Sequence, residues 1–174
     1  MLLPSTEMQL GSQRSFGTVG LAVLGNGIPV LDVSPVTPGG FYTDPVELPL
    51  TYDRSRDGFL LGYFACGTIG APAGNVVLGV AFTHGVSGAV PVNVGYVVTV
   101  PIPNLWTANE LLRVDLLNAG LPAFPASLFA QRTILGIRLI RVTTDPTDTW
   151  NGTLRFLPFV KVTYSALCSF CGPC

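Results

Sequence analysis

The feature that most restricts the fold is a series of short apolar segments separated by glycine, proline, asparagine and aspartate. The segments are rich in valine, isoleucine, phenylalanine, tyrosine and threonine, a composition that is typical of β-strands bounded by turns. Eight segments are predicted to be strands: residues 17–24, 28–33, 46–52, 58–66, 75–83, 90–100, 133–143 and 153–164. Gly25-Asn26-Gly27, between the first two, indicates a hairpin. Because no β–α–β alternation is visible, we expect an all-β chain.

Three architectures fit eight short antiparallel strands, namely a jelly roll, an up-and-down barrel and a partial immunoglobulin-like sandwich. The long irregular connections at 34–45 and 101–132 disfavour an up-and-down meander, which needs only tight turns. We therefore expect one eight-stranded jelly-roll barrel or sandwich over residues 1–174. Within it, residues 1–15 are predicted to be an N-terminal arm and residues 165–174 a cysteine-rich tail.

One short helix is predicted in the long connection before the last two strands. Thr107 is a candidate N-cap, and Glu110 stands three residues later, which is the spacing of a capping box. Trp106 and Leu111 have the spacing of a hydrophobic staple, and Gly120 is placed to end the helix. A second short turn is expected from Pro125.

The chain carries little charge, and the little it carries is unevenly placed. Charged residues make up 11% of the sequence, well below the roughly 25% of ordinary soluble domains. Residues 58–109 contain no Asp, Glu, Lys or Arg, and the net charge is −1. Such a balance gives nucleic acid no basic surface to bind. Glycine and proline interrupt the neutral tract, so it does not read as a membrane-spanning helix. An uncharged surface of this kind favours a subunit that faces other protein.

The last predicted strand has two apolar residues on its charged side. Leu157 and Phe159 share that side with Arg155, Lys161 and Thr163. Two large apolar side chains on an outward face indicate that something covers them. The cover is either another segment of this chain or another subunit.

Four cysteines are candidates for covalent or metal chemistry: Cys66, Cys168, Cys171 and Cys174. The CGPC sequence matches a thioredoxin-type box, but no helix can follow it here to lower the thiol pKa. Four thiolates would suffice for a zinc site or an iron–sulfur cluster, although zinc sites usually pair two C-x-x-C knuckles. Disulfides within the chain or between subunits are the favoured interpretation, because a terminal segment gains most from covalent fixing.

No catalytic constellation is recognisable. His84 is the single histidine, has no cysteine or carboxylate near it in sequence, and is interpreted as a strand-end side chain. Acidic residues occur near 44–57, and the mixed charges of Asp53, Arg54, Arg56 and Asp57 are typical of a solvated turn or an ion-paired loop. The sequence contains neither G-x-S-x-G nor H-E-x-x-H. We therefore expect no enzyme, no metal or other cofactor, and no small-molecule substrate.

In its overall character, the chain resembles the smaller major capsid protein of tailless, icosahedral, membrane-containing bacteriophages of thermophilic bacteria. The likeness rests on length, eight apolar strands, proline-rich loops, low charge and eight arginines against one lysine. It implies a single jelly roll that forms oligomers and assembles with a larger companion capsid protein in a virion shell, close to an internal viral membrane. It also implies a set of subunit-interface residues: Leu157, Phe159, Arg138, Arg141, Trp106 and Trp150.

Two other classes of function stay open on the sequence. A carbohydrate-binding or receptor-binding β-sandwich would need exposed aromatic side chains, for which Tyr42, Trp106 and Trp150 are the candidates. An outer-membrane barrel is disfavoured by the long irregular loops and by an N-terminus that does not look like a signal peptide.

Overall fold

The computed structural model describes residues 5–25, 27–48, 59–68, 72–86, 88–104, 106–116 and 133–165. Eleven strands and no helix are found in these ranges. The strands are β1 (Ser5–Gly17), β2 (Val19–Val23), β3 (Pro29–Val33), β4 (Gly39–Thr43), β5 (Val46–Glu47), β6 (Phe59–Cys66), β7 (Gly74–Gly85), β8 (Val92–Ile102), β9 (Leu111–Asp115), β10 (Ile134–Arg141) and β11 (Leu154–Ser165). No helix in this part of the chain has the length and apolar character to cross a membrane.

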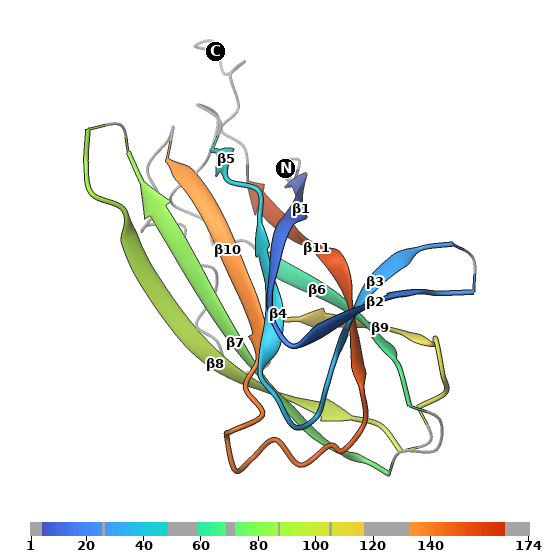
Figure 1. Ribbon diagram of the computed structural model, residues 1–174. Coiled ribbons are helices and arrows are strands. Elements are labelled where there is room, and N and C mark those ends of the chain that lie inside the picture. The colour runs from blue at the N-terminus through green and yellow to red at the C-terminus, as the bar shows by residue number, and fades with distance from the viewer. Residues whose placement is uncertain are drawn as a thin grey trace, which may run out of the picture.

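The strands pair antiparallel and form two sheets that share β1 (Figure 1). The first sheet contains β2, β3, β11, β6 and β9 together with the first half of β1. The second contains the other half of β1, then β4, β10, β7 and β8, with β5 also paired to β10. The register of β1 shifts between Ser12 and Arg14, where its partner changes from β11 to β4. This irregularity lets one strand turn the corner between the sheets.

The core lies between the two sheets and is built from side chains that alternate along each strand. On β7, Val76, Leu78, Val80 and Phe82 are all buried, as expected for the inward positions of a strand. In the centre, the Phe156 ring makes edge-on contacts with those of Phe41 and Phe64, at centroid distances of 6.0 and 5.3 Å. Edge-to-face packing of this kind adds about 0.5–1.5 kcal/mol per pair beyond simple burial. The observed fold is therefore an all-β antiparallel sandwich, which confirms the predicted class.

Every one of the eight predicted segments contains a strand, but the count of eight is too low. The hairpin at Gly25–Gly27 is confirmed: β2 pairs with β3, and Gly27 has a φ of 82°. Three strands were not expected: β1, β4 and β9. Residues 5–15 of the expected N-terminal arm belong to β1, which pairs with β11 and β4. The jelly-roll arrangement stays a prediction.

The helix predicted to begin at Thr107 does not form within residues 107–116. Glu110 does accept hydrogen bonds from the backbone nitrogen of Thr107 at 3.1 Å and from its hydroxyl at 2.6 Å. These two bonds, the hydroxyl first, lower the pKa of Glu110. However, Asn109 has a φ of 64°, and Leu111–Asp115 forms β9 against β6. The capping contacts thus close a tight turn instead of starting a helix. The backbone N–H and C=O groups that would bond within a helix pair with β6 instead. Gly120 and Pro125 lie outside the described residues.

Candidate functional site

The outward face of the second sheet is the candidate site, because it combines an uncharged surface with a hollowed shape. Cross-strand pairing places Tyr42, Arg138, Ala81 and Gly95 side by side across β4, β10, β7 and β8. The neighbouring row consists of Gly40, Ile140, Gly79 and Val97. In the first row, Ala81 and Gly95 are both small beside Arg138, and in the second, Gly79 lies between Ile140 and Val97. The face is therefore low along β7 and higher on β10.

Two hollows follow one another along this low line. One of about 360 Å³ is lined by Gly79, Ala81, Gly95, Val97, Arg138, Ile140 and Val142, with the adjoining residues Val80 and Tyr96. The other, of about 250 Å³, is lined by Pro45, Thr83, Gly85, Val86, Ala89, Pro91, Ile134 and Gly136. We call the two together the outer groove. Its floor is backbone and small side chains, so an extended apolar segment or sheet face can approach it closely.

The chemistry of the outer groove is almost entirely apolar. Arg138 is the one charged residue in its lining. Its uncharged polar side chains are those of Thr83 and Tyr96. The Thr83 hydroxyl donates a hydrogen bond to the side-chain oxygen of Asn93 at 2.5 Å. In the part of the chain that the structure describes, no three His, Cys, Asp or Glu side chains are grouped as metal ligands would be. The groove is thus suited to bury apolar surface rather than to hold an ion.

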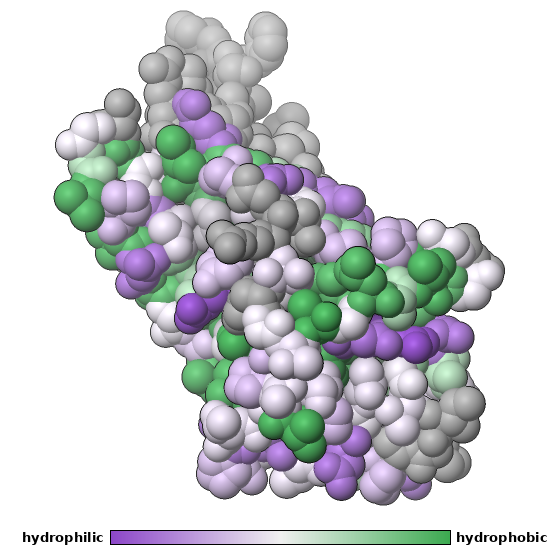
Figure 2. All heavy atoms as spheres, in the orientation of Figure 1, coloured by the Kyte–Doolittle hydropathy of each residue, from purple (hydrophilic) through white to green (hydrophobic). Residues whose placement is uncertain are grey.

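A second apolar surface lies on the hairpin of β2 and β3, which projects from the body of the sandwich (Figures 1 and 2). Leu21 is 87% exposed and Val23 63% exposed, and Ile28 is exposed near the turn. Such large exposed fractions on three neighbouring apolar residues are unusual for a surface that meets only water. The hairpin tip is therefore a second candidate contact region.

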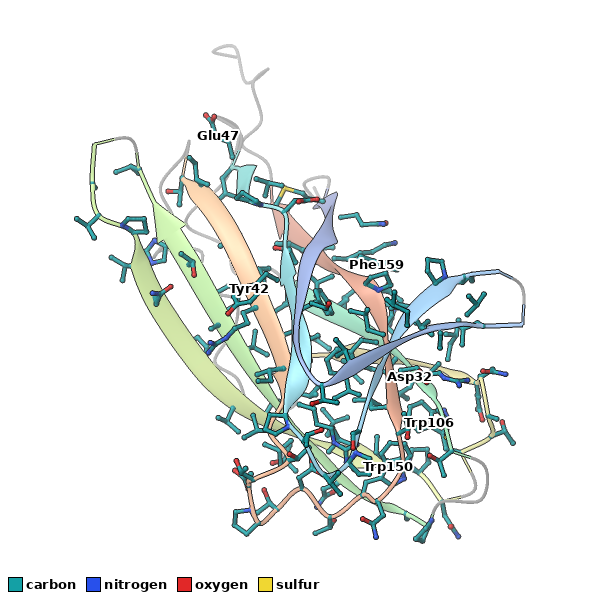
Figure 3. All side chains as sticks on the ribbon, viewed as in Figure 1. Asp32, Tyr42, Glu47, Trp106, Trp150 and Phe159 are labelled. Atoms are coloured by element: carbon teal, nitrogen blue, oxygen red, sulfur yellow. The ribbon has the colours of Figure 1, made fainter. Side chains whose placement is uncertain are left out.

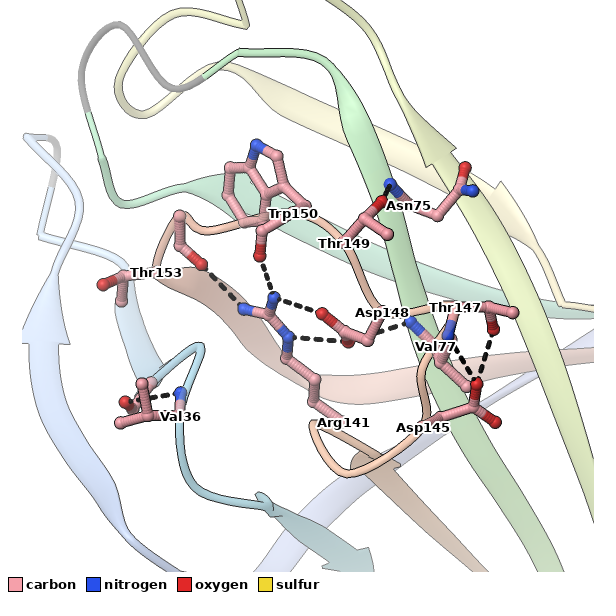
Figure 4. Close-up of polar contacts among 12 residues, drawn as sticks. Val36, Asn75, Val77, Arg141, Asp145, Thr147, Asp148, Thr149, Trp150 and Thr153 are labelled. Carbon is pink, nitrogen blue, oxygen red and sulfur yellow. Dashed lines mark hydrogen bonds and ion pairs between the residues drawn. The ribbon is translucent and has the colours of Figure 1, made fainter.

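Of the two arginines predicted at an interface, only Arg138 is exposed. Arg141 is fully buried and forms an ion pair with Asp148, at 2.7 Å between Nη2 and Oδ1 and 3.0 Å between Nε and Oδ2 (Figure 4). Nη1 also donates to the carbonyl oxygen of Gly152, at 2.7 Å, and Nη2 to that of Trp150. Arg141 does pair with a carboxylate, but with one of its own chain.

Trp106 and Trp150, expected at a surface, lie inside the molecule (Figure 3). They are 3% and 1% exposed, and their rings contact each other at a centroid distance of 5.6 Å. Trp106 also donates its indole N–H to the carbonyl of Glu110 at 3.1 Å. Neither indole can meet a sugar or a partner subunit without opening the sandwich. Tyr42, 40% exposed, is the remaining candidate aromatic on the outer face.

Leu157 and Phe159 are covered by their own chain to different degrees. Leu157 is buried against Leu24, Val30 and Ala65, because the β2–β3 hairpin folds over that side of β11. Phe159 is half-buried and packs on the Tyr63 ring at 5.3 Å between centroids. For Leu157 the cover is thus a segment of the same chain.

Cys66 is fully buried, and its thiol donates to the carbonyl of Thr68 at 2.9 Å. Its strand partner is Leu154, at the opposite end of β11 from Ser165. A disulfide between Cys66 and the tail would therefore have to run back along β11, and it stays a prediction. Cys168, Cys171 and Cys174 themselves lie outside the described residues.

Apart from Arg138, which was predicted at an interface, the residues of the outer groove were not identified as a site from the sequence, although a pattern was present. Along β7, the large residues Leu78, Val80 and Phe82 alternate with Gly79, Ala81 and Thr83. This alternation predicts a strand with one packed face and one face of small side chains. What the sequence could not show is that β8 and β10 flank this strand, and that their outward residues complete the hollows.

Fold and site together define a two-sheet antiparallel β-sandwich with an apolar hollow on one sheet. No model of a known protein family matches the chain, and no curated protein matches it. Among solved structures, the chain is similar to the enzymatically active domain of tailspike protein 4 of bacteriophage CBA120, at 16% identity and a TM-score of 0.36. That match covers 94% of this chain but only 19% of the tailspike chain.

Two carbohydrate-binding modules are also similar in structure. The family 11 module of Clostridium thermocellum, in complex with a β-1,3-1,4-mixed-linked tetrasaccharide, has 13% identity and a TM-score of 0.41, over 96% of this chain and 92% of that one. TmCBM61, in complex with β-1,4-galactotriose, has 12% identity and a TM-score of 0.33, over 85% and 86%. At these identities the likeness concerns the sandwich fold alone.

Proposed function

We propose that this protein is a non-enzymatic structural subunit that associates with copies of itself and with a companion protein in a virion shell. The observation that carries the proposal is the outer face of the second sheet, where an apolar groove contains a single charged residue, Arg138. Because burying apolar surface contributes about 25 cal/mol per Å², such a face favours association over exposure to water. The companion capsid protein and the nearby viral membrane are included in the proposal because the family resemblance implies them.

The first test is the state of association of the purified protein. We expect light scattering to show oligomers whose mass rises with concentration, and further growth when the other structural proteins of the source particle are added. A protein that stays monomeric at high concentration, and never enters a particle, would contradict the proposal.

A variant in the outer groove tests whether the copies associate through this surface. A side chain fits at Gly136, because the nearest atom to an added Cβ is the Thr83 carbonyl oxygen at 3.9 Å. Gly136→Lys therefore leaves the sandwich intact while it places a second cation beside Arg138. We expect association to weaken by about tenfold or more, since a like charge buried in an interface costs several kcal/mol. Circular dichroism of the variant checks that the fold is unchanged.

Carbohydrate binding is the second candidate function, and one observation favours it. Tyr42, the exposed aromatic residue on the outer face, is the strand neighbour of Arg138, so a ring and a hydrogen-bond donor lie together. Sugar sites combine these two kinds of group. The burial of Trp106 and Trp150 leaves this site with less aromatic area than the sequence predicts. Binding on a glycan array at low micromolar affinity, lost in Tyr42→Ala, would favour this function over assembly.

A further inference from the structure

The strand β8 is a long edge strand in the described part of the molecule. It lies at the end of the second sheet and pairs with β7 alone (Figure 1). With 11 residues, it is about twice the length of an ordinary strand. Every residue from Val92 to Ile102 that has a partner in β7 continues one unbroken register, so no bulge twists the edge away.

Proteins usually protect such edges, and β8 lacks the usual protection. Edge strands are commonly blunted by charged side chains, prolines, bulges or short length. β8 has no charged residue, and its one proline, Pro101, stands next to its end. The edge strand of the first sheet is different: β9 has five residues and carries Arg113 and Asp115. β2, the other edge, also has only five residues. In the long edge, the protection is thus limited to Pro101, and residues 92–100 have neither a charge, a proline nor a bulge.

The absence of charge favours a second copy of this chain as the partner. In a symmetric pair, the same strand of both copies lies at the contact. Any net charge on that strand would therefore face the same net charge on its copy. β8 belongs to the neutral tract of residues 58–109 and avoids this cost. Val92 and Val97, 53% and 59% exposed, would be covered by the symmetric contact.

We propose that two copies associate through antiparallel pairing of β8 with β8 about a two-fold axis, so that the second sheet continues across the dimer. Full overlap of two eleven-residue strands places the axis at Val97, the middle residue. The outer grooves of the two copies then lie on one continuous sheet face. This proposal rests on the proposed function, for which it names the partner and the first contact of assembly.

Hydrogen exchange tests the pairing without any variant. In an edge strand, alternate backbone amides face solvent, and a new strand partner protects them. We expect deuterium uptake in a peptide over residues 92–102 to fall as the protein concentration rises through the dimerisation range. Uptake over β9 should stay unchanged, which makes residues 111–115 the internal control.

Charge variants at Val97 test the position of the axis. Val97→Lys and Val97→Asp each place like charges opposite one another, and we expect the dimer dissociation constant to rise about tenfold or more for either alone. An equimolar mixture of the two should recover the dimer, because opposite charges then meet. Leu111→Lys is the matched control, since Leu111 is 53% exposed on the other sheet, and it should dimerise like the original protein.

The outcomes separate this proposal from the proposed function. Oligomers that form with unchanged exchange in β8, and that tolerate both charges at Val97, would overturn the β8 contact and leave a structural subunit that assembles elsewhere. A chain that associates neither with itself nor with other particle proteins would overturn both.

Discussion

At the scale of single residues, the buried pair of Arg141 and Asp148 fixes the loop between β10 and β11. The Asp148 side chain also accepts the backbone N–H of Val77 at 3.0 Å, so one carboxylate connects this loop to β7 (Figure 4). A buried charge is costly unless it is paired and hydrogen-bonded, and Arg141 both pairs with Asp148 and donates to two carbonyl oxygens. The pair therefore holds three segments together, and neither charge reaches a partner molecule.

Asp148→Ala is expected to lower the free energy of unfolding by about 3–5 kcal/mol, because it leaves the Arg141 cation buried without a partner. Urea denaturation measures the change. Asp145→Ala is the control in the same loop. The Asp145 carboxylate accepts bonds from the Thr147 hydroxyl and backbone, which lower its pKa, but these bonds stay within one turn, so we expect a clearly smaller loss. Equal losses in the two variants would contradict the role given to the buried pair.

At the scale of elements, the close approach of β4 to β10 depends on a residue without a side chain. A Cβ added to Gly40 would overlap the carbonyl oxygen of Leu139 and would lie 2.7 Å from the Cα of Ile140. Both atoms are backbone and cannot turn away. β4 was not predicted from the sequence, because two glycines begin a segment of only five residues. What makes it a strand is its place between β1 and β10.

Gly40→Ala is expected to destabilise the protein by about 1–3 kcal/mol, the usual cost of forcing extra atoms into a packed site. Gly20→Ala is the matched control on β2, where an added Cβ meets only the Cβ of Asp32 at 3.5 Å. That variant should be neutral or slightly stabilising, since alanine reduces the entropy of the unfolded chain. Thermal unfolding of both variants measures the difference. A Gly40→Ala protein as stable as the control would show that β4 and β10 are not this close.

At the scale of the whole molecule, the sheet topology places Cys66 in the core beside one end of β11. β11 runs from Leu154, beside Cys66, to Ser165, from which the tail continues. The thiol at one end of the sandwich is buried, and Cys168 and Cys171 follow the other end of β11. The predicted disulfides of Cys66, Cys168, Cys171 and Cys174 therefore stay predictions, and Cys66 is the one of the four whose surroundings the structure describes.

In the folded protein, Cys66 is expected to resist alkylation by iodoacetamide for hours, because a buried thiol is inaccessible without unfolding. Mass spectrometry of labelled peptides, with and without denaturant, measures this. In denaturant the same peptide should be fully modified, which controls for its chemical reactivity. Alkylation of Cys66 as fast in the folded protein as in denaturant would contradict its burial in the core.

Part of the fold and little of the candidate site could be predicted from the sequence, and particular residues show why. Segments such as 75–83 and 133–143 are strands because β-branched residues and alternation are local properties. β1 was missed because Ser5–Gly17 alternates weakly and depends on β11 and β4 for its pairing. The groove was missed because its lining comes from strands whose neighbours are set by topology.

By itself, the sequence determined the all-β class, the positions of eight strands, the β2–β3 hairpin and the neutral surface from residue 58 to 109. These follow from composition, periodicity and turn residues, which act over a few neighbours along the chain. Only the tertiary structure decided that Leu111–Asp115 is a strand, that Arg141 and both tryptophans are buried, and that Cys66 pairs with Leu154 in the core. Each of these depends on which distant segment becomes a neighbour, because long-range pairing and burial override local preference.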